Sequence, residues 1–156
     1  MIKRFGGLLI SVLLCEFVGL AGSIPTFPSI ANWYQTLNKP GFTPPNWLFG
    51  PAWTTLYALM GISLFLVWEK RKKKGARLAL AIFGLQLTLN FFWSIIFFGL
   101  HQPLFAFIEI ILLWLAIFIT IKKFYPISKT AGLILIPYLA WVSFASVLNF
   151  FIAKLN

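Results

Sequence analysis

The sequence is poor in acidic residues and in cysteine, and each shortage excludes a class of protein. No Asp occurs among the 156 residues, and Glu is limited to Glu16, Glu69 and Glu109. Charged residues make up 10% of the chain, whereas soluble proteins contain roughly 25%. An ordinary soluble domain is therefore excluded. The single cysteine, Cys15, rules out a disulfide framework and a cysteine-based zinc site.

Apolar residues are correspondingly abundant. They make up 60% of the chain, include 18 Phe and 7 Trp, and give a mean hydropathy of +0.90. At about 1.5 Å per helical residue, five apolar runs are long enough to cross a hydrocarbon core of about 30 Å. The sequence predicts an all-α membrane protein, a single integral-membrane domain (1–156) built as a five-helix bundle. The predicted spans are residues 5–24, 47–68, 78–100, 104–121 and 131–153.

Basic residues are distributed unevenly over the connections between these runs. If the spans alternate in direction, eleven of the 13 basic residues share the side of the N-terminus, and only Lys39 and Lys154 lie opposite. Short loops rich in Lys and Arg stay in the cytoplasm. We therefore predict a multi-pass protein of the cell (inner) membrane, with its N-terminus in the cytoplasm and its C-terminus outside.

The densest basic segment is 70–74, Lys-Arg-Lys-Lys-Lys. In a polar protein such a cluster indicates nucleic-acid binding, but the accompanying Phe and Trp favour a membrane, so no nucleic-acid partner is expected. A topogenic role explains the cluster best, and an anionic-lipid patch is the alternative.

The connection from Pro25 to Asn46 is neither polar nor flexible. It contains five prolines, which fix the backbone, and the apolar side chains of Trp33, Tyr34, Leu37 and Phe42. We interpret it as a structured lid, with a short helix that begins after Asn32 and ends before Lys39-Pro40. An aromatic belt in the headgroup region is the alternative interpretation.

Three tryptophans fall too deep to be interfacial anchors. Counted from the outer ends of the spans at about 1.5 Å per residue, Trp53, Trp93 and Trp141 lie about 9, 10 and 18 Å inside. Their indole N–H groups need buried partners. Trp33, Trp47 and Trp68 fit the interfacial role instead.

Polar and aromatic residues recur at helical spacing on three of the spans. Side chains three and four residues apart share a helix face, and polar groups in lipid turn inward. We predict one cavity beneath the lid, whereas the alternative is that Gln86, Asn90 and Asn149 only bridge helices. The three faces are Trp53, Tyr57 and Met60; Gln86, Asn90, Trp93, Ser94 and Phe97; and Tyr138, Trp141, Ala145 and Asn149.

The remaining ionisable residues do not form a metal or catalytic set. Glu16 and Glu109 are the only carboxyl groups within the spans, and His101 stands alone in a loop, so no metal site is predicted. We expect Glu16 to face the interior and to hydrogen-bond a Trp, Tyr or Asn. No hydrolase, nucleotide-binding or zinc-protease motif occurs.

Four segments carry a resemblance to a known family. They begin at Trp33-Tyr34, Pro44-Pro45, Gln86-Leu87 and Pro137-Tyr138, and read WYxxLxKP, PPxWxFGPxWTxLY, QLxLNxxWSxxFFG and PYLAWxxFAxxLN. In this order and spacing they resemble the translocator protein family, also known as TspO/MBR, tryptophan-rich sensory proteins or peripheral-type benzodiazepine receptors. The resemblance covers nearly the whole chain.

The resemblance implies a five-helix bundle, usually a homodimer, that binds porphyrins such as protoporphyrin IX and haem. It also implies binding of isoquinoline carboxamides and other hydrophobic small molecules, and a light-dependent oxidative breakdown of the porphyrin. No further cofactor is implied. The family's ligand-binding positions correspond here to Tyr34, Pro45, Trp53, Tyr57, Asn90, Trp93, Ser94, Trp141 and Ala145.

These residue types suit a flat aromatic ligand. Indoles stack on a porphyrin face, Asn90 and the indole N–H groups can bond its edge, and Lys39 can pair with a propionate. Trp53 and Trp141 are the candidates for oxidation by an excited porphyrin, which requires no acid–base pair. The expected role is a tetrapyrrole sensor or scavenger, and the alternatives are a small transporter of porphyrins or other apolar anions and a structural partner protein. The weak sterol pattern of animal members lacks its Tyr here, because Phe150 and Phe151 stand near its place.

Overall fold

The computed structural model describes residues 2–156, with side chains from Arg4 onward, so Met1 and the side chain of Lys3 lie outside the described part. Five helical segments in it are long and apolar enough to span a membrane, which confirms the prediction. Two of them carry a local irregularity. The spans are α1 (Ile2–Ser23), α4 (Asn46–Trp68), α5 (Ala76–Ser94) with η1 (Ile95–Gly99), α6 (Pro103–Phe124), and α7 (Lys129–Ile134) with α8 (Ile136–Leu155).

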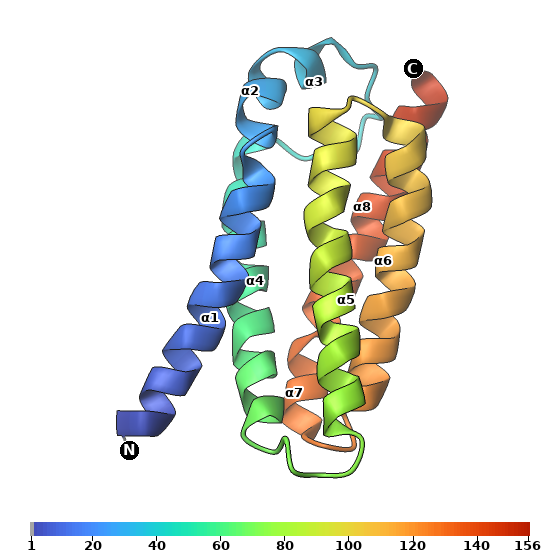
Figure 1. Ribbon diagram of the computed structural model, residues 1–156. Helices are drawn as coiled ribbons and strands as arrows, with labels where there is room; N and C mark the ends of the chain where they lie inside the picture. The colour runs from blue at the N-terminus through green and yellow to red at the C-terminus, as the bar shows by residue number, and fades with distance from the viewer. Residues whose placement is uncertain (1) are drawn as a thin grey trace.

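The spans form an up-and-down bundle whose two ends differ (Figure 1). The N-terminus, the α4–α5 connection and the α6–α7 connection lie at one end, together with the basic segment 70–74. Two short helices, the α5–α6 connection and the C-terminus lie at the other end. The alternation of spans assumed from the sequence is therefore present in the fold.

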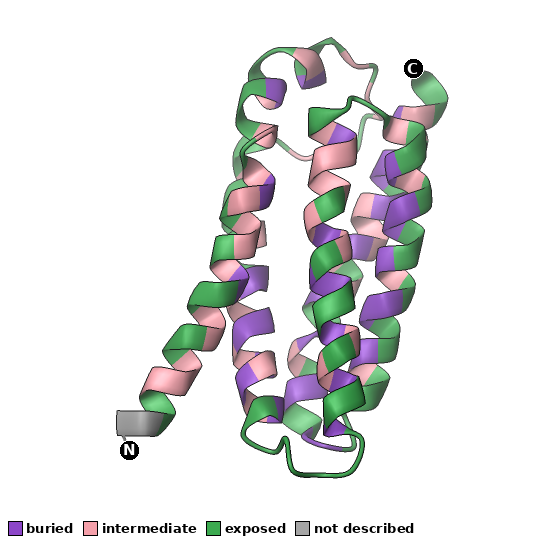
Figure 2. Ribbon diagram, in the orientation of Figure 1, coloured by how far each residue is buried: buried purple, intermediate pink, exposed green. Residues whose placement is uncertain are grey.

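Helix α1 stands at the edge of the bundle and is its least buried span, as Figure 2 shows. It packs chiefly on α4 through small residues. A Cβ at Gly61 would meet the backbone of α1, including the nitrogen of Val12 at 2.8 Å, and a Cβ at Gly19 would meet the ring of Tyr57. Such close approach is the usual role of small residues between membrane helices.

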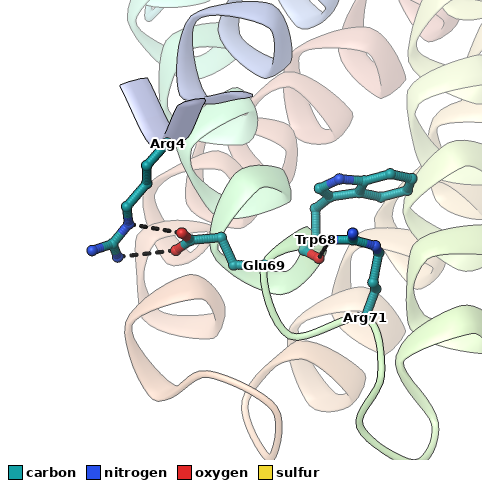
Figure 3. Close-up of polar contacts among 4 residues, drawn as sticks. All are labelled: Arg4, Trp68, Glu69 and Arg71. Atoms are coloured by element: carbon teal, nitrogen blue, oxygen red, sulfur yellow. Dashed lines mark hydrogen bonds and ion pairs between the residues drawn. The ribbon is translucent and has the colours of Figure 1, made fainter. Parts of the chain in front are cut away.

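An ion pair fastens the other end of α1 to α4. Arg4 donates to both carboxylate oxygens of Glu69, at 2.7 and 3.0 Å (Figure 3). Nearby, the Arg71 side chain bonds the carbonyl of Trp68 and lies over its ring. The pair is exposed and contributes about 1 kcal/mol or less. It also occupies the only acidic residue next to the basic segment.

Two short helices make up the connection after α1, α2 (Thr26–Ala31) and α3 (Trp33–Thr36). The structured, proline-rich loop is thus confirmed as a lid, and α2 is an addition that the sequence did not predict. Helix α3 begins directly after Asn32, as predicted, but the side chain of Asn32 makes no capping bond to it and donates to the carbonyl of Pro28. Helix α3 ends at Thr36, where the backbone of Leu37 becomes extended, before Lys39-Pro40 as predicted.

Span α5 ends in a π-helical turn, η1. The N–H of Leu100 donates to the carbonyl of Ile95, five residues earlier, at 2.8 Å. Such a turn holds one more residue than an α-turn and often occurs at functional sites. Here it places Phe97, which is buried, and Phe98 beneath the lid, where both contact the ring of Tyr34.

Candidate functional site

A cavity of about 400 Å³ lies between the lid and the middle of the bundle. Every span except α6 contributes to its wall, and α2 and α3 form its roof. Aromatic side chains dominate the lining. Its principal residues are Glu16, Gly19, Ser23, Phe27, Ile30, Tyr34, Trp47, Phe49, Trp53, Tyr57, Asn90, Trp93, Ser94, Phe97, Phe98, Trp141, Ala145 and Asn149.

The structure brings together eight of the nine residues predicted to bind a ligand. Tyr34, Trp53, Tyr57, Asn90, Trp93, Ser94, Trp141 and Ala145 all line the cavity. The exception is Pro45 of the lid, which is not among the residues that line the cavity. Its extended backbone starts α4, and its carbonyl accepts the first bond of that helix, from Leu48. Whether the eight residues bind a ligand stays a prediction.

The floor of the cavity is a hydrogen-bonded layer across three spans. The hydroxyl of Tyr57 donates to Oδ1 of Asn90, and Nδ2 of Asn90 donates to the hydroxyl of Tyr138 at 2.7 Å. Tyr138 in turn donates to Gln86 at 2.9 Å. All four residues are buried. We call them the polar layer; it leaves Asn90 committed to the protein, so the residue both bridges helices and forms the cavity floor.

Below the polar layer the bundle is filled. Phe83 and Phe124 stack with centroids 5.6 Å apart, and Met60 and Val67 are fully buried. The hydroxyl of Ser63 donates to the carbonyl of Ala131 at 2.7 Å, which ties α4 to α7. We call this region the closed half and the region between the polar layer and the lid the cavity half.

The deep tryptophans differ in how their N–H groups are used. Nε1 of Trp93 donates to Asn149 at 3.0 Å, and Asn149 donates on to the carbonyl of Pro103 at 2.7 Å. Nε1 of Trp141 is buried and has no partner in the described part of the chain. A buried donor without a partner costs about 1–3 kcal/mol. The expectation of a buried partner is therefore met for Trp93 and not for Trp141.

Trp53 and Trp141 stand edge to face in the same wall, with centroids 6.5 Å apart and planes at 86°. Trp53 also contacts Tyr57, at 5.8 Å between centroids. The two candidate redox residues are thus neighbours on facing helices, α4 and α8. Their perpendicular rings present a face and an edge to whatever occupies the cavity.

The lid is held down by contacts to both sides of the cavity mouth. Ser29 donates to the carbonyl of Phe98 and lies 3.2 Å from Nε2 of His101, whose ring stacks on Trp33 with centroids 4.3 Å apart. Asn38 and Asn156 exchange hydrogen bonds at 3.0 Å. Among the residues predicted as interfacial anchors, Trp33 is therefore part of the lid, whereas Trp47 and Trp68 are exposed.

Two residues of the lid serve its own structure. Lys39 donates to the carbonyl of Tyr34 at 2.6 Å and to that of Leu37 at 3.3 Å, and does not line the cavity, so it is not placed to pair with a propionate there. Tyr34 is 4% exposed, and this burial raises the pKa of its hydroxyl to about 12.

The two membrane carboxyl groups lie in different places. Glu16 lines the cavity from α1, and in the described structure it makes no hydrogen bond to a Trp, Tyr or Asn, contrary to expectation. Glu109 is buried on α6 away from the cavity, and neither of its oxygens has a partner among the described residues. The described residues contain no group of three His, Cys, Asp or Glu that could hold a metal.

Sequence reasoning missed the contribution of α1 and α2 to the cavity. Gly19 and Ser23 of α1 and Phe27 and Ile30 of α2 line it. The small residues of α1 were a usable signal, because they recur on the face that carries Glu16. No sequence signal indicated α2, since its prolines favoured an extended loop.

Comparison with known proteins gives one consistent result. Residues 11–155 match the model of the TspO/MBR family. The chain is 51% identical to the tryptophan-rich protein TspO of Archaeoglobus fulgidus, over 96% of each chain. It is 37% identical to the tryptophan-rich sensory protein of Cereibacter sphaeroides, over 92% of this chain and 91% of that one. It is 38% identical to the human translocator protein, over 80% of this chain and 75% of that one.

Proposed function

Because this chain belongs to the TspO/MBR family, we propose that it binds porphyrins such as protoporphyrin IX or haem in the cavity beneath the lid, as a tetrapyrrole sensor or scavenger of the membrane. One observation carries this proposal. The buried N–H of Trp141 has no partner among the described residues and lies in a wall of perpendicular indoles. A flat ring with polar atoms at its edge would stack on one indole and accept the bond of the other.

The other walls support the same kind of ligand. Phe49 contacts Trp141 edge to face, and Trp93 stacks on Phe97 at 5.3 Å between centroids. Aromatic walls with a few fixed polar groups are typical of sites for apolar ring systems. Hydrophobic aromatic carboxamides would fit for the same reason.

A dark titration of the purified protein with protoporphyrin IX, followed by Trp fluorescence, tests binding. We expect saturation, and roughly tenfold weaker binding in Trp141→Phe, because one hydrogen bond and part of a stacking surface are lost. Trp114→Phe is the matched control, since Trp114 donates to Ser143 outside the cavity. Equal loss in both variants, or no saturation in the unmodified protein, contradicts the proposal.

We also propose light-dependent oxidative breakdown of the bound porphyrin, with dioxygen as the oxidant. Trp53 and Trp141 would lie against the excited ring and act as electron donors to it. Absorbance under illumination should then reveal a product that free porphyrin does not give and that Trp53→Phe and Trp141→Phe do not form. Bleaching at the rate of free porphyrin in all three proteins would leave a binding protein without this activity.

We propose a homodimer in a cell (inner) membrane, with the N-terminus in the cytoplasm. The concentration of basic residues at the end opposite the lid supports this orientation. Cys15 is buried, so an introduced Lys154→Cys or Lys72→Cys can be labelled against little background. An impermeant thiol reagent applied outside should label the first and not the second; the reverse pattern overturns the orientation.

A further inference from the structure

The cavity has an unbalanced set of charges. Among the described residues its lining contains one carboxyl group, Glu16, and no Lys, Arg or His. Lys39, the basic residue of the connection 25–46, donates to the lid carbonyls of Tyr34 and Leu37 and does not line the cavity. A ligand inside the cavity therefore meets an acidic group without a compensating cation.

Glu16 is not used by the protein itself. In the described structure the ion pair of α1 is made by Arg4 with Glu69, at the opposite end of the helix. The hydroxyl of Tyr57, on the facing helix α4, is directed to Asn90. Ionisable groups within a membrane face the interior and are usually paired, and this carboxyl remains available to a ligand.

From these observations we infer that Glu16 selects ligands by charge: the cavity takes neutral or positively charged ring systems, and a porphyrin binds with its carboxylates held at the mouth. The inference rests on the proposed function and specifies the ligand class of the same site. Like charges interact strongly where water is excluded, so a carboxylate beside Glu16 is disfavoured and an ammonium or N–H group is favoured.

The two sides of the cavity then orient the ligand. The carboxyl of Glu16, on α1, accepts hydrogen bonds, and Nε1 of Trp141, on α8, donates one. A ring with a donor on one edge and an acceptor on the opposite edge satisfies both. A ligand with carboxylates on both edges satisfies only Trp141.

A charge series on one ring tests this inference. The probes are protoporphyrin IX, its neutral dimethyl ester, and a diamide whose two side chains end in ammonium groups. Affinities are measured in the dark for the unmodified protein, Glu16→Gln and Glu109→Gln. Glu109→Gln is the matched control, because it makes the same substitution at a membrane carboxyl outside the cavity. Comparing ratios of affinities between variants cancels the different partition of the probes into detergent.

We expect Glu16→Gln to favour the free acid over the neutral dimethyl ester by roughly tenfold relative to the unmodified protein, as one charge at about 10 Å and an effective dielectric constant of about 20 predicts. The shift in favour of the free acid over the diamide should be roughly a hundredfold, because these two probes carry opposite charges. Glu109→Gln should leave the ratios unchanged. Ser23→Lys, which adds a cation to the same wall, should shift the ratios in the same direction as Glu16→Gln.

Unchanged ratios in Glu16→Gln and Ser23→Lys, or an equal shift in Glu109→Gln, would overturn the inference while leaving porphyrin binding intact. If no member of the series binds to any of the proteins, the proposed function and this inference both fail. A correctly folded Glu16→Gln protein is identified by its thermal unfolding, and Ser23→Lys provides the same test if that variant does not fold.

Discussion

The cavity half and the closed half are the two ends of one helical bundle, and they differ in how tightly their side chains are packed. Below the polar layer, Phe83, Phe124 and Val67 fill the space between the spans, and Ser63 is bonded to a neighbouring helix. Above it, large aromatic rings surround a space, and the N–H of Trp141 has no partner within the part of the chain that the structure describes. The bundle is therefore closely packed at one end and holds a cavity at the other.

The polar layer is the boundary between the two halves. Tyr57, Asn90 and Tyr138 come from α4, α5 and α8 and meet in one buried layer. In lipid, a hydrogen bond between helices contributes about 1 kcal/mol on average, but a buried hydroxyl without a partner costs more. The layer thus fixes the three helices at the depth where packing gives way to space.

Disrupting the polar layer should have the largest effect on stability. Asn90→Leu leaves the hydroxyl of Tyr57 without its acceptor and that of Tyr138 without a donor, so we expect about 3 kcal/mol lower stability. Thermal unfolding in detergent measures the change. Thr88→Val is the control, because Thr88 bonds only the carbonyl of Gly84 on its own helix. Equal stability of the two variants would mean that the hydrogen bonds of the polar layer do not stabilise the packing of α4, α5 and α8.

Adding a methyl group where α4 approaches the backbone of α1, in the closed half, should have the next largest effect on stability. In Gly61→Ala the new Cβ meets the Val12 nitrogen at 2.8 Å and the Ser11 carbonyl at 2.9 Å. Because these are backbone atoms, α1 must move, at a cost of about 2 kcal/mol. Gly84→Ala, where a Cβ meets nothing within 4 Å, should be neutral or slightly stabilising. Denaturation midpoints of both variants check the prediction.

Two tryptophans of the cavity half should respond with opposite signs. Trp93→Phe removes the donor to Asn149 and should destabilise the empty protein by about 1 kcal/mol. Trp141→Phe removes a buried donor that has no partner in the described structure, so the empty protein should be as stable or slightly more so. Thermal unfolding without ligand distinguishes them. A loss in Trp141→Phe as large as that in Trp93→Phe would show that its N–H is satisfied.

Loosening the lid should affect the cavity half alone. His101→Gly removes the contacts to Ser29 and Trp33. Glycine adopts the φ of 54° at this position without strain. We expect roughly 1 kcal/mol weaker protection of residues 26–36 from hydrogen exchange. Exchange in the closed half should not change. His101→Ala adds backbone strain at the positive φ and should weaken the protection of residues 26–36 further than His101→Gly does.

The smallest effect concerns the ionisation of the lid. The pKa of Tyr34 is raised by burial from 10.0 to about 12, so its contribution to stability is complete below pH 10 and is lost as the pH rises through 12. Tyr34→Phe should remove this part of the alkaline loss, measured by lid exchange between pH 10 and 12. An identical alkaline profile in the variant would contradict the assignment to Tyr34.

Much of this arrangement could be predicted from the sequence because membranes impose simple rules. Span length and hydropathy located the five helices, and helical spacing placed Trp53, Asn90 and Trp141 around one space. Side-chain partners could not be predicted in the same way. Whether Nε1 of Trp141 meets a hydrogen-bond acceptor depends on the relative rotation of α8 and α4. The spacing of residues within one helix does not determine that rotation.

The lid was the hardest part to predict in detail. Its prolines indicated rigidity, but they did not reveal that Pro45 and Lys39 lie outside the cavity lining, Pro45 at the start of α4 and Lys39 bonded to a lid carbonyl. A charged side chain near a helix C-terminus readily bonds the last carbonyls, and at Lys39 this local contact takes the place of the expected contact with a ligand.

The π-helical turn at the end of α5 has a consequence for how this protein tolerates changes in length. A wide turn arises when a helix accommodates one surplus residue without altering the helix on either side. Deleting one residue from the segment Ile95–Gly99 would let α5 wind regularly to its end and leave the residues before and after the turn in place. The change would fall on the turn itself, where Phe97 and Phe98 contact Tyr34 of the lid. In a regular part of the same span, a deletion would instead rotate everything that follows by about 100°.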